Sequence, residues 1–569
     1  MIAAMNPRQR LWLGTALALL AACHSSRSPP SSVWAPDPAA VRASYSIDAD
    51  YLREQIARIS SDAFEGRGPA TRGDAAARNY LVEQLRALNV SPGLGAGPWE
   101  QAVDLLSITT QMPKAWTFER GAARVSLAWS DAYVAATGTQ EEHGGIDSAE
   151  VVFVGYGIQS PEFDWDDFKG RDVRGKILLM MNNDPDWDPG LFAGTTRLYY
   201  GRWTYKFESA ARHGALGAII IHTTPSAGYP FQVVRSTWGG PRFELPRAGE
   251  PALTVQGWVT EDGARALATL AGTDLGRLTE AARSRAFSPI SLGITTTLRF
   301  ESRIEHVRSA NVVGVLRGRD PSVADQFVVL SAHHDHLGIG RPNGAGDRIY
   351  NGALDNAAGD AQVLAITRAF QALPHPPRRS VLILFSAAEE QGLLGSRYFT
   401  ENPPVPLGKL VAVVNYDGGN IWGRTRDVVQ IGIGKSSVDG VVARIARWQG
   451  RVVRPDAFPD RGTLYRSDQF SFARVGVPPI YMKPGIDFIG RPPEWGREQI
   501  VDYEAHDYHQ PSDELRPSWN FEGLVDDARF GFFAALEIAE AEDAPEWVAG
   551  DEFEAARKSA VRANGHDAR

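Results

Sequence analysis

Histidines and carboxylates gather in one part of the chain, where each follows a short apolar run. His333 and Asp335 come at the end of FVVLSAHHD, the adjacent Glu389 and Glu390 follow VLILFS, and Asp417 follows VAVVNY. Imidazole nitrogens and carboxylate oxygens bind zinc and related metals, and a carboxylate that binds no metal can serve as a general base. The spacing therefore predicts a metal site with an acid–base group beside it.

The apolar runs predict the elements that position these residues. Runs of roughly four to eight residues that are rich in Val, Ile and Leu and end on polar or glycine positions are typical of buried parallel strands. Ligand sites in an open α/β sheet form just beyond the carboxyl ends of such strands. We therefore expect an α/β fold, with a mostly parallel central sheet, helices on both faces and the metal site at one edge.

Local geometry suggests which role each of these residues takes in the site. Residues i and i+2 of a strand project the same way, so Asp335 is placed either to accept the ring N–H of His333 or to contact the reaction centre. Asp355, in NGALDNAAGD, opens a helix, where its two oxygens can bridge two cations. Neighbours in an extended chain face apart, so of Glu389 and Glu390 one is expected to be a ligand and the other to hold the attacking water.

Two further positions complete the candidate set. Asp417 supplies another carboxylate, and His509, in the polar loop YHQPSD, is the last ligand candidate, with His506 as its competitor. Two Zn²⁺ ions would be balanced by Asp355, Glu390, Asp417 and one further negative charge, as a site shielded from water prefers. Zinc leads among the metals, and manganese or cobalt would also suit these ligands.

Several motifs now allow a comparison with a known family. AHHDHLG, GALDNAAGD, SAAEEQGLLGS, VNYDGG, SDQFSFARVGVP and YHQPSDE resemble the bacterial di-zinc aminopeptidase family, whose relatives include glutamate carboxypeptidase, transferrin receptor and glutaminyl cyclase. LREQIARISSDAFEGRG extends the resemblance toward the N-terminus. FVGYGI, DWDDFKGRDVRGKILL and KFESAARHGALGAIIIH look like an inserted protease-associated domain.

The resemblance implies a role for each matching position. One zinc ion would be held by His333 and Asp417, the other by Glu390 and His509, and Asp355 would bridge the two. Glu389 would be the general base, and Asp335 would support His333. The family often has serine where GALDNAAGD has alanine, and VNYDGG has tyrosine before the ligand aspartate; neither departure removes a ligand.

The function that the resemblance implies is that of a metallo-exopeptidase that acts on peptides as an aminopeptidase and releases N-terminal residues. Export and membrane anchoring are predicted from the N-terminus, as described below. The alternatives are a carboxypeptidase or dipeptidase of the same fold, a glutaminyl-cyclase-like acyltransferase and an inert binding scaffold. The complete ligand set counts against the last two.

The apolar pattern divides the chain into segments: a signal peptide at 1–22, a tether at 23–45, a discontinuous peptidase domain at 46–112 and 303–546, an insert at 113–302 and a charged tail at 547–569. Within the insert, tracts rich in aromatic residues, Gly and Pro are expected to form loops that lean over the neighbouring site, at Trp187–Trp203 and Gly228–Pro246. The glycine-rich loop Phe64–Gly73, between two predicted helices, is expected to be a connector.

The N-terminus predicts export. Arg8 and Arg10 precede the apolar run Leu11–Ala22, which is typical of a signal peptide. LAAC at its end resembles a lipoprotein signal in which Cys23 becomes lipidated. His24 is not the aspartate that retains lipoproteins at an inner membrane, so we expect an outer-membrane anchor with the protein facing the periplasm.

The composition argues against nucleic acid as a partner, against an internal disulfide and against a transmembrane helix after residue 22. The chain has a net charge of −9, which argues against nucleic acid as a partner. With 1 cysteine it has no internal disulfide, and no stretch after residue 22 is apolar and long enough to predict a transmembrane helix. Peptide substrates and a membrane reached through the lipid anchor are the expected partners, and the sequence indicates no oligomeric state.

Overall fold

The structure is a computed structural model that describes residues 34–93, 95, 97–247 and 249–566. The chain from Pro36 onward forms one compact unit. Within the described ranges no helix combines the length and apolar character that crossing a membrane requires. The expected signal peptide and Cys23 lie outside the described residues.

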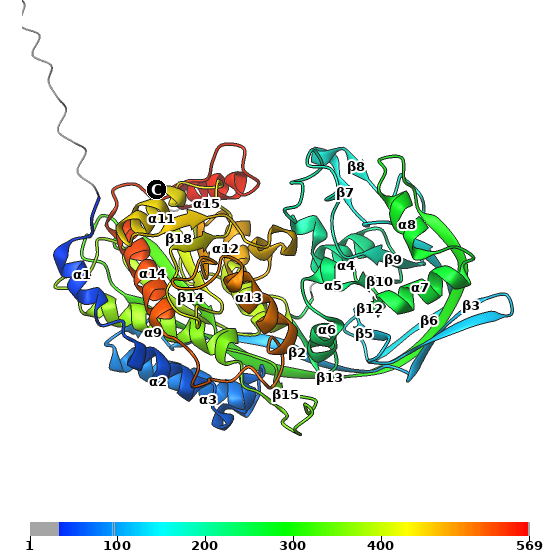
Figure 1. Cartoon of the computed structure of the whole chain (residues 1–569), viewed down its shortest axis with the longest axis horizontal. Coiled ribbons are helices and arrows are strands. Elements are labelled where there is room, and N and C mark those ends of the chain that lie inside the picture. Colours follow the sequence, from blue (N-terminus) through cyan, green and yellow to red (C-terminus); the bar gives the residue numbers. More distant parts are fainter. Residues whose placement is uncertain (1–33, 94, 96, 248, 567–569) are drawn as a thin grey trace, which may run out of the picture. The chain divides into compact units, whose positions relative to one another are not determined.

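A mostly parallel central sheet contains the strands that the apolar runs predict (Figure 1). Its strands, in spatial order, are β13 (Ile290–Leu316), β17 (Ser380–Ser386), β14 (Phe327–His333), β18 (Leu410–Tyr416), β21 (Pro479–Lys483), β19 (Asp427–Gln430) and β20 (Val452–Arg454). β17, β14, β18 and β21 are parallel, whereas β13 and β19 run antiparallel to their neighbours β17 and β21. Every residue of β14, β17 and β18 is buried. Burial on both faces explains why these strands are continuous apolar runs without alternation.

Helices cover both faces of this sheet. They are α1 (Pro38–Ser44), α2 (Ala49–Ile59), α3 (Arg72–Ala87), α9 (Ala358–Gln371), α10 (Leu394–Glu401), α11 (Val438–Trp448), α12 (Gln469–Arg474), α13 (Trp495–His506), α14 (Glu522–Glu540) and α15 (Glu554–His566). α9 and α14 pack on one face, and α2 lies against α9. On the other face Phe399 of α10 and Phe472 of α12 join Val329 and Leu384 in one core cluster. The expected α/β fold is confirmed.

The insert has a sheet of its own. Its order is β5 (Tyr133–Thr137), β12 (Val255–Thr260), β10 (Gly217–His222), β9 (Ile177–Met181) and β6 (His143–Phe153). The helices around it are α4 (Trp203–Arg212), α5 (Thr224–Ala227), α6 (Phe231–Trp238), α7 (Glu261–Leu270) and α8 (Leu275–Ala282). Two apolar clusters built on this sheet give the insert its own core.

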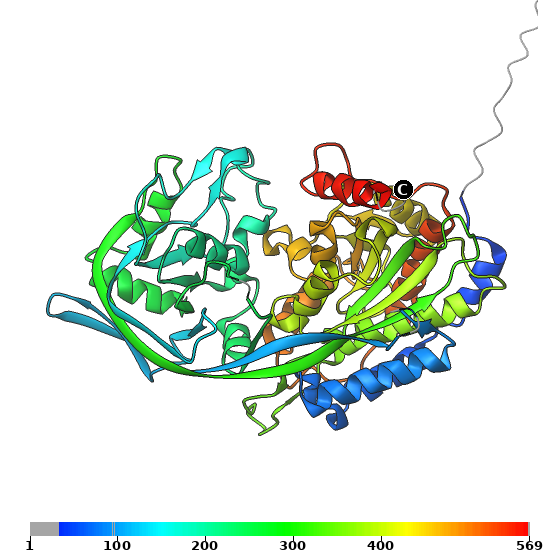
Figure 2. The ribbon, with the colours of Figure 1, turned by 180° about the vertical axis from the view of Figure 1, so that it is seen from behind.

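One strand runs through both sheets. β13 is 27 residues long; its first part pairs with β6 and its last part with β17. Figure 2 shows β13 and its antiparallel partner β2 (Glu100–Gln111) as a long curved ribbon. Gln111 pairs with Glu301, close to both expected ends of the insert. The minor strands are β1 (Ser91–Pro92), β3 (Ala115–Arg120), β4 (Ala123–Ala128), β7 (Gln159–Ser160), β8 (Trp165–Asp166), β11 (Arg242–Glu244), β15 (Gly338–Ile339) and β16 (Ile349–Tyr350).

The segment expected to be a tether up to residue 45 contains a helix, α1. Asp37 caps it by accepting the backbone N–H of Ala39 at 2.7 Å, and a proline occupies its first turn. Ala40 and Ala43 are buried. The tether prediction was therefore wrong for Pro38–Ser44, because small alanines can pack closely without showing a strong apolar pattern.

The segment expected to be a charged tail is also folded in part. Trp547 and Phe553 are buried in a cluster with Tyr465 and Phe470, and the Trp547 indole donates to the carbonyl of Gly476 at 2.8 Å. α15 follows this cluster. Charges on the outer side of α15 gave the segment its tail-like composition, while two aromatic residues fix it to the domain.

Candidate metal centre

The carboxyl ends of adjacent parallel strands bring the predicted residues together. His333 is the last residue of β14, and Asp417 directly follows β18. Glu389 and Glu390 come shortly after β17, in a short 3₁₀ turn. β17, β14 and β18 are neighbours in register, so these side chains meet at one edge of the sheet, as expected.

Ligand atoms at this edge fall into two groups. One atom each of His333, Glu389 and Asp417 lie within 4.8 Å of one another, and the same holds for His336, Asp355 and Glu390.

Asp355, a member of the second group, also faces His333 of the first group and His509. Its Oδ1 is 3.4 Å from Nε2 of His333, and its Oδ2 is 3.3 Å from Nε2 of His509. One carboxylate thus faces a histidine of each side with a separate oxygen.

Glu389 and Glu390 differ in their contacts. Glu390 Oε1 is 2.6 Å from Nδ1 of His336, and its Oε2 is 2.9 Å from Nε2 of His509. No hydrogen bond occupies the Glu389 carboxylate among the described residues, and Glu389 lines the two cavities described below. The two residues are in a turn, with Ala388 before them at φ 51°, and not in extended chain. The two carboxylates thus differ in their contacts, but the extended-chain geometry on which the sequence-based expectation rested was wrong.

The pKa values of Glu389 and Glu390 are also shifted in opposite directions. Burial raises the pKa of Glu389 well above its usual range; His333 opposes this rise, and Asp417 adds to it. Burial acts against ionisation of Glu390 as well, but the positive charge of His509 beside it holds its pKa at about 2.

Asp335 acts differently from the expectation that its carboxylate accepts the ring N–H of His333. Nδ1 of His333 lies 3.1 Å from the backbone carbonyl of Asp335 and 3.8 Å from its carboxylate. The carboxylate instead accepts the backbone N–H groups of Glu389 at 2.9 Å and Glu390 at 3.4 Å. The strand ends at His333, so the i, i+2 geometry does not extend to Asp335, which fixes the glutamate turn.

His336 is a site residue that the sequence analysis did not select. It is fully buried and contacts Glu390. Its other ring nitrogen, Nε2, is buried without a hydrogen-bond partner in the described part of the chain. His336 belongs to the motif AHHDHLG, which the sequence analysis used. It lies beyond the end of the strand at His333, and its position alone does not distinguish a site histidine from a surface residue.

His509, and not His506, joins the site. His506 is exposed and contacts Asp502 of its own helix at 3.0 Å. The loop that carries His509 is fixed by Asp513, which accepts the backbone N–H groups of Leu354 and Asp355 at 3.0 Å each.

A contact from the insert reaches His509. Oγ1 of Thr237, on α6, is 3.1 Å from Nδ1 of His509. The next residue of the same loop is also held, because Gln510 donates to Oγ of Ser236 at 3.1 Å.

Arg67, in the loop expected to be a connector, is a second residue that the sequence analysis missed. Its side chain is fully buried and donates to the carbonyls of His334 at 2.9 Å, Asn351 at 2.6 Å and Gly352 at 2.9 Å. A further bond reaches the carbonyl of Ile59 at 3.0 Å. Arg67 therefore ties the loop after β14 to the loop that leads to Asp355.

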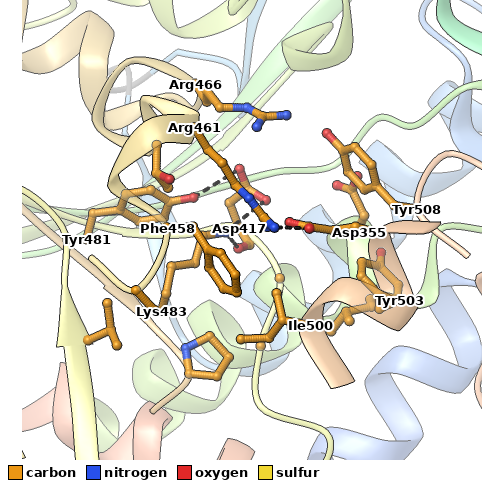
Figure 3. A pocket seen from close by; sticks show the side chains of 18 of the residues that line it. Asp355, Asp417, Phe458, Arg461, Arg466, Tyr481, Lys483, Ile500, Tyr503 and Tyr508 are labelled. Atoms are coloured by element: carbon orange, nitrogen blue, oxygen red, sulfur yellow. Dashed lines mark hydrogen bonds and ion pairs between the residues drawn. The ribbon is translucent and has the colours of Figure 1, made fainter. Parts of the chain in front are cut away.

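A cavity opens beside the ligand groups (Figure 3). Its lining includes Asp355, Glu389, Glu390 and Asp417. Apolar and aromatic side chains form its walls, namely Trp422, Val429, Phe458, Tyr481, Ile500, Tyr503 and Tyr508. Lys483 lies next to Asp417, donating to its carbonyl at 2.6 Å.

A second cavity adjoins the same glutamates from the side of the insert. The insert contributes Tyr199, Arg202, Trp203, Tyr229, Thr237 and Trp238 to its lining. These residues all come from the two tracts that the sequence analysis expected to form loops leaning over the site. Both tracts border the site, but the second is not a loop throughout, because Phe231–Trp238 forms the helix α6.

The residues fit a zinc centre. Nε2 of His509 is buried 2.9 Å from Glu390 and makes no well-aligned hydrogen bond, so a cation held between the two would satisfy this nitrogen. Four carboxylates crowd into one buried edge, an arrangement that requires compensating cations. Imidazole with carboxylate is a typical ligand set for Zn²⁺.

Comparisons with known proteins agree with this geometry. Residues 311–528 match Peptidase family M28. The chain is 26% identical to aminopeptidase NAALADL1 of Rattus norvegicus over 284 residues, covering 42% of this chain and 34% of that protein. It is 31% identical to probable glutamate carboxypeptidase AMP1 of Arabidopsis thaliana over 124 residues, covering 21% of this chain and 16% of that protein. The chain thus spans about a third of the length of NAALADL1 and a smaller share of AMP1.

Among solved structures, the chain is similar to an aminopeptidase from Aneurinibacillus sp. strain AM-1. The TM-score is 0.51 at 18% identity, with 88% of this chain and 96% of that chain covered, so the two share a fold. The part of the chain that is similar to Peptidase family M28, residues 311–528, contains both ligand groups and His509.

Proposed function

We propose that the chain is a zinc-dependent exopeptidase that binds two zinc ions and releases N-terminal residues from peptides. The observation that carries the proposal is the position of Asp355, with one oxygen toward His333 and the other toward His509. A carboxylate between two ligand groups suits a pair of cations. His333 and Asp417 would hold one ion, Glu390 and His509 the other, and Asp355 both.

The chain's own residues then divide the reaction. Bound zinc would polarise the scissile carbonyl and acidify the attacking water. Glu389, whose carboxylate faces the cavities, takes a proton from that water and passes it to the leaving amine. Asp335 holds Glu389 in place through its backbone N–H, and Lys483 fixes the loop of Asp417.

Hydrolysis of unblocked peptides by the zinc-loaded protein tests this proposal. A tripeptide amide should lose its N-terminal residue, its N-acetylated counterpart should not, and a chelator should abolish the activity until zinc is restored. Release of the C-terminal residue from an N-acetylated tripeptide with a free carboxylate would favour the carboxypeptidase alternative. A zinc-loaded chain that cleaves none of these peptides would contradict the peptidase.

We propose further that the chain is exported and held at a bacterial outer membrane by a lipid on Cys23. Arg8, Arg10 and the apolar run Leu11–Ala22 followed by Cys23 support this. The insert at 113–302 is proposed to be a protease-associated domain, supported by FVGYGI and the KFESAARHGALGAIIIH run. Its role would be to shape access to the site, since its residues line the second cavity.

A further inference from the structure

The carboxylate of Glu389 depends on its backbone for its position. No hydrogen bond reaches this carboxylate among the described residues, and Nε2 of His333 lies 3.9 Å from it. The contacts that hold the glutamate turn, residues 388–393, therefore also set the direction of the proposed general base. A misplacement of about 1 Å at a reacting group can cost about 100-fold in rate.

The glutamate turn has a strained backbone. Ala388 before the two glutamates and Leu393 after them are both left-handed, with φ of 51° and 62°. A residue other than glycine keeps such a conformation only where the surrounding contacts enforce it. The turn must therefore be held by contacts with neighbouring segments.

Two polar contacts hold the turn, one from each side. Asp335 accepts the backbone N–H groups of Glu389 and Glu390. Directly after these glutamates, Oε1 of Gln391 accepts the backbone N–H of Phe243 at 3.2 Å. Phe243 belongs to β11 of the insert, 148 residues away along the chain. One of the two contacts that fix the turn thus comes from the insert.

The N–H of Phe243 is available because it points away from the partner strand of β11. β11 pairs with β2 in antiparallel register, with Phe243 opposite Ser107. In an antiparallel pair, successive residues direct their N–H groups alternately toward the partner strand and away from it. The N–H of Phe243 is of the second kind, since it is donated to Gln391. The Gln391 amide thus takes the place that a further strand would occupy.

Apolar contacts join the same segments. Ala388 and Leu394 are buried in one cluster with Val103 and Leu105 of β2, and Phe243 packs against this cluster. The glutamate turn therefore packs on β2 and β11 as well as bonding to β11.

We propose that Gln391 is a positioning residue for Glu389, through which β11 of the insert fixes the turn that carries the general base. The inference rests on the proposed peptidase function. It gives the insert a part in the chemistry in addition to its part in access. Gln391 is not one of the proposed ligands, so its loss should lower turnover and leave zinc binding unchanged.

Two substitutions of Gln391 test the contact. Gln391→Leu removes the acceptor, so kcat of the zinc-loaded protein on an unblocked tripeptide amide should fall by roughly 3- to 10-fold, with KM and zinc content little changed. Gln391→Glu keeps an acceptor oxygen of the same reach and should restore most of kcat. Gln371→Leu is the matched control. Gln371 is exposed at the end of α9 and donates to the carbonyl of Asn89 at 3.1 Å, so its replacement should leave kcat unchanged.

Phe243→Pro removes the same bond from the side of the insert. Proline lacks the N–H but leaves the pairing of β11 with β2, because this N–H does not point toward β2. Phe243→Leu keeps the N–H and controls for the lost ring. We expect kcat to be roughly 3- to 10-fold lower in Phe243→Pro than in Phe243→Leu. Adding Gln391→Leu to Phe243→Pro should lower kcat little further, because both changes remove one bond. Circular dichroism verifies the folding of each variant.

Amide hydrogen exchange, followed by mass spectrometry, reports on the turn without requiring activity. In the zinc-loaded protein, the backbone amides of residues 388–394 should exchange faster in Gln391→Leu than in the wild type. In Gln391→Glu they should exchange at the wild-type rate.

The outcomes separate this inference from the proposed function. If the wild type hydrolyses the peptide and Gln391→Leu keeps the wild-type kcat, the positioning role is overturned and the peptidase stands. An equal fall of kcat in Gln391→Glu, or losses that multiply in the double variant, also overturn it. If the zinc-loaded wild type cleaves no peptide, the peptidase fails and the exchange rates decide. Equal rates in Gln391→Leu and wild type then overturn the role of Gln391 in fixing the turn, and faster exchange supports it.

Discussion

Thr237 and His509 connect the insert to the candidate metal centre. Oγ1 of Thr237 lies 3.1 Å from Nδ1 of His509, and the same hydroxyl donates to the carbonyl of Val233 at 3.1 Å. Because its proton is engaged, the hydroxyl oxygen is free to accept an N–H from Nδ1, which would leave Nε2, on the side of Glu390, available to bind a cation. Such an outer contact fixes the orientation of a histidine ligand.

Replacing Thr237 by Val should therefore weaken zinc binding. Valine keeps the shape and removes the acceptor, and we expect a loss of roughly 10-fold or more in affinity for one of the two ions. Competition with a chromophoric chelator measures this. Ser236→Ala is the matched control, because Ser236 contacts Gln510 and no proposed ligand. Equal zinc affinity in Thr237→Val and wild type would show that the insert does not orient His509.

Arg67 should be essential for stability. Arg67→Met leaves the carbonyls of Ile59, His334, Asn351 and Gly352 without their donor, and each buried unsatisfied group costs about 1–3 kcal/mol. We expect the free energy of unfolding in urea to fall by at least about 3 kcal/mol. Arg72→Met, at a side chain that is 88% exposed, should change it by less than about 0.5 kcal/mol. A similar small change in both variants would contradict the role given to Arg67.

His222 should make stability depend on pH. Burial lowers its pKa from 6.5 to about 4, so the unfolded chain takes up a proton that the folded chain resists. This contribution is fully present above pH 6.5 and is lost as the pH falls toward about 4.

His222→Gln retains a donor for the carbonyl of Tyr229, which His222 contacts at 3.1 Å. The variant should lose less stability than wild type between pH 6.5 and about 4, with a difference of at most about 3 kcal/mol. Urea unfolding at several pH values measures it, with His306→Gln at an exposed position as control. Parallel curves for His222→Gln and wild type would rule out the effect.

The strand-end ligands could be predicted because local sequence determines them. His333 and Asp417 end or follow buried runs, and parallel strands place such ends at one edge. The contacts that the sequence did not reveal join distant segments: 267 residues separate Arg67 from His334, and 272 separate Thr237 from His509. Such pairs depend on tertiary packing, which no local pattern encodes.

The contact of Asp335 was predicted wrongly for a different reason. Its position two residues after His333 suggested a shared strand face, but the strand ends at His333, and a turn directs the carboxylate to the backbone of Glu389. One residue of difference in a strand boundary changed the predicted partner. Element boundaries are the least certain part of any sequence-based expectation.

The proposed lipid anchor predicts a change of location without a change of chemistry. Cys23→Ser should release the protein from the membrane fraction, because a lipidated N-terminus with several acyl chains binds far more strongly than one chain. Hydrolysis should persist in the released protein, since Cys23 precedes the folded unit that begins at Pro36. Wild-type protein that is found in the soluble fraction and carries no lipid by mass spectrometry would refute the anchor.

The zinc content and turnover of Glu389→Gln and Glu390→Gln test the central claim most directly. Glu389→Gln leaves every proposed ligand in place, so it should bind two zinc ions, while turnover falls by about 10²–10⁴, the usual effect of losing a positioned general base. Glu390→Gln replaces a charged ligand by a neutral one and should lose or weaken one ion, with activity partly restored by added zinc. Mass-spectrometric metal analysis of both purified variants, alongside their kinetics, gives the answer. Loss of an ion from Glu389→Gln, together with two ions and no activity in Glu390→Gln, would contradict the assignment.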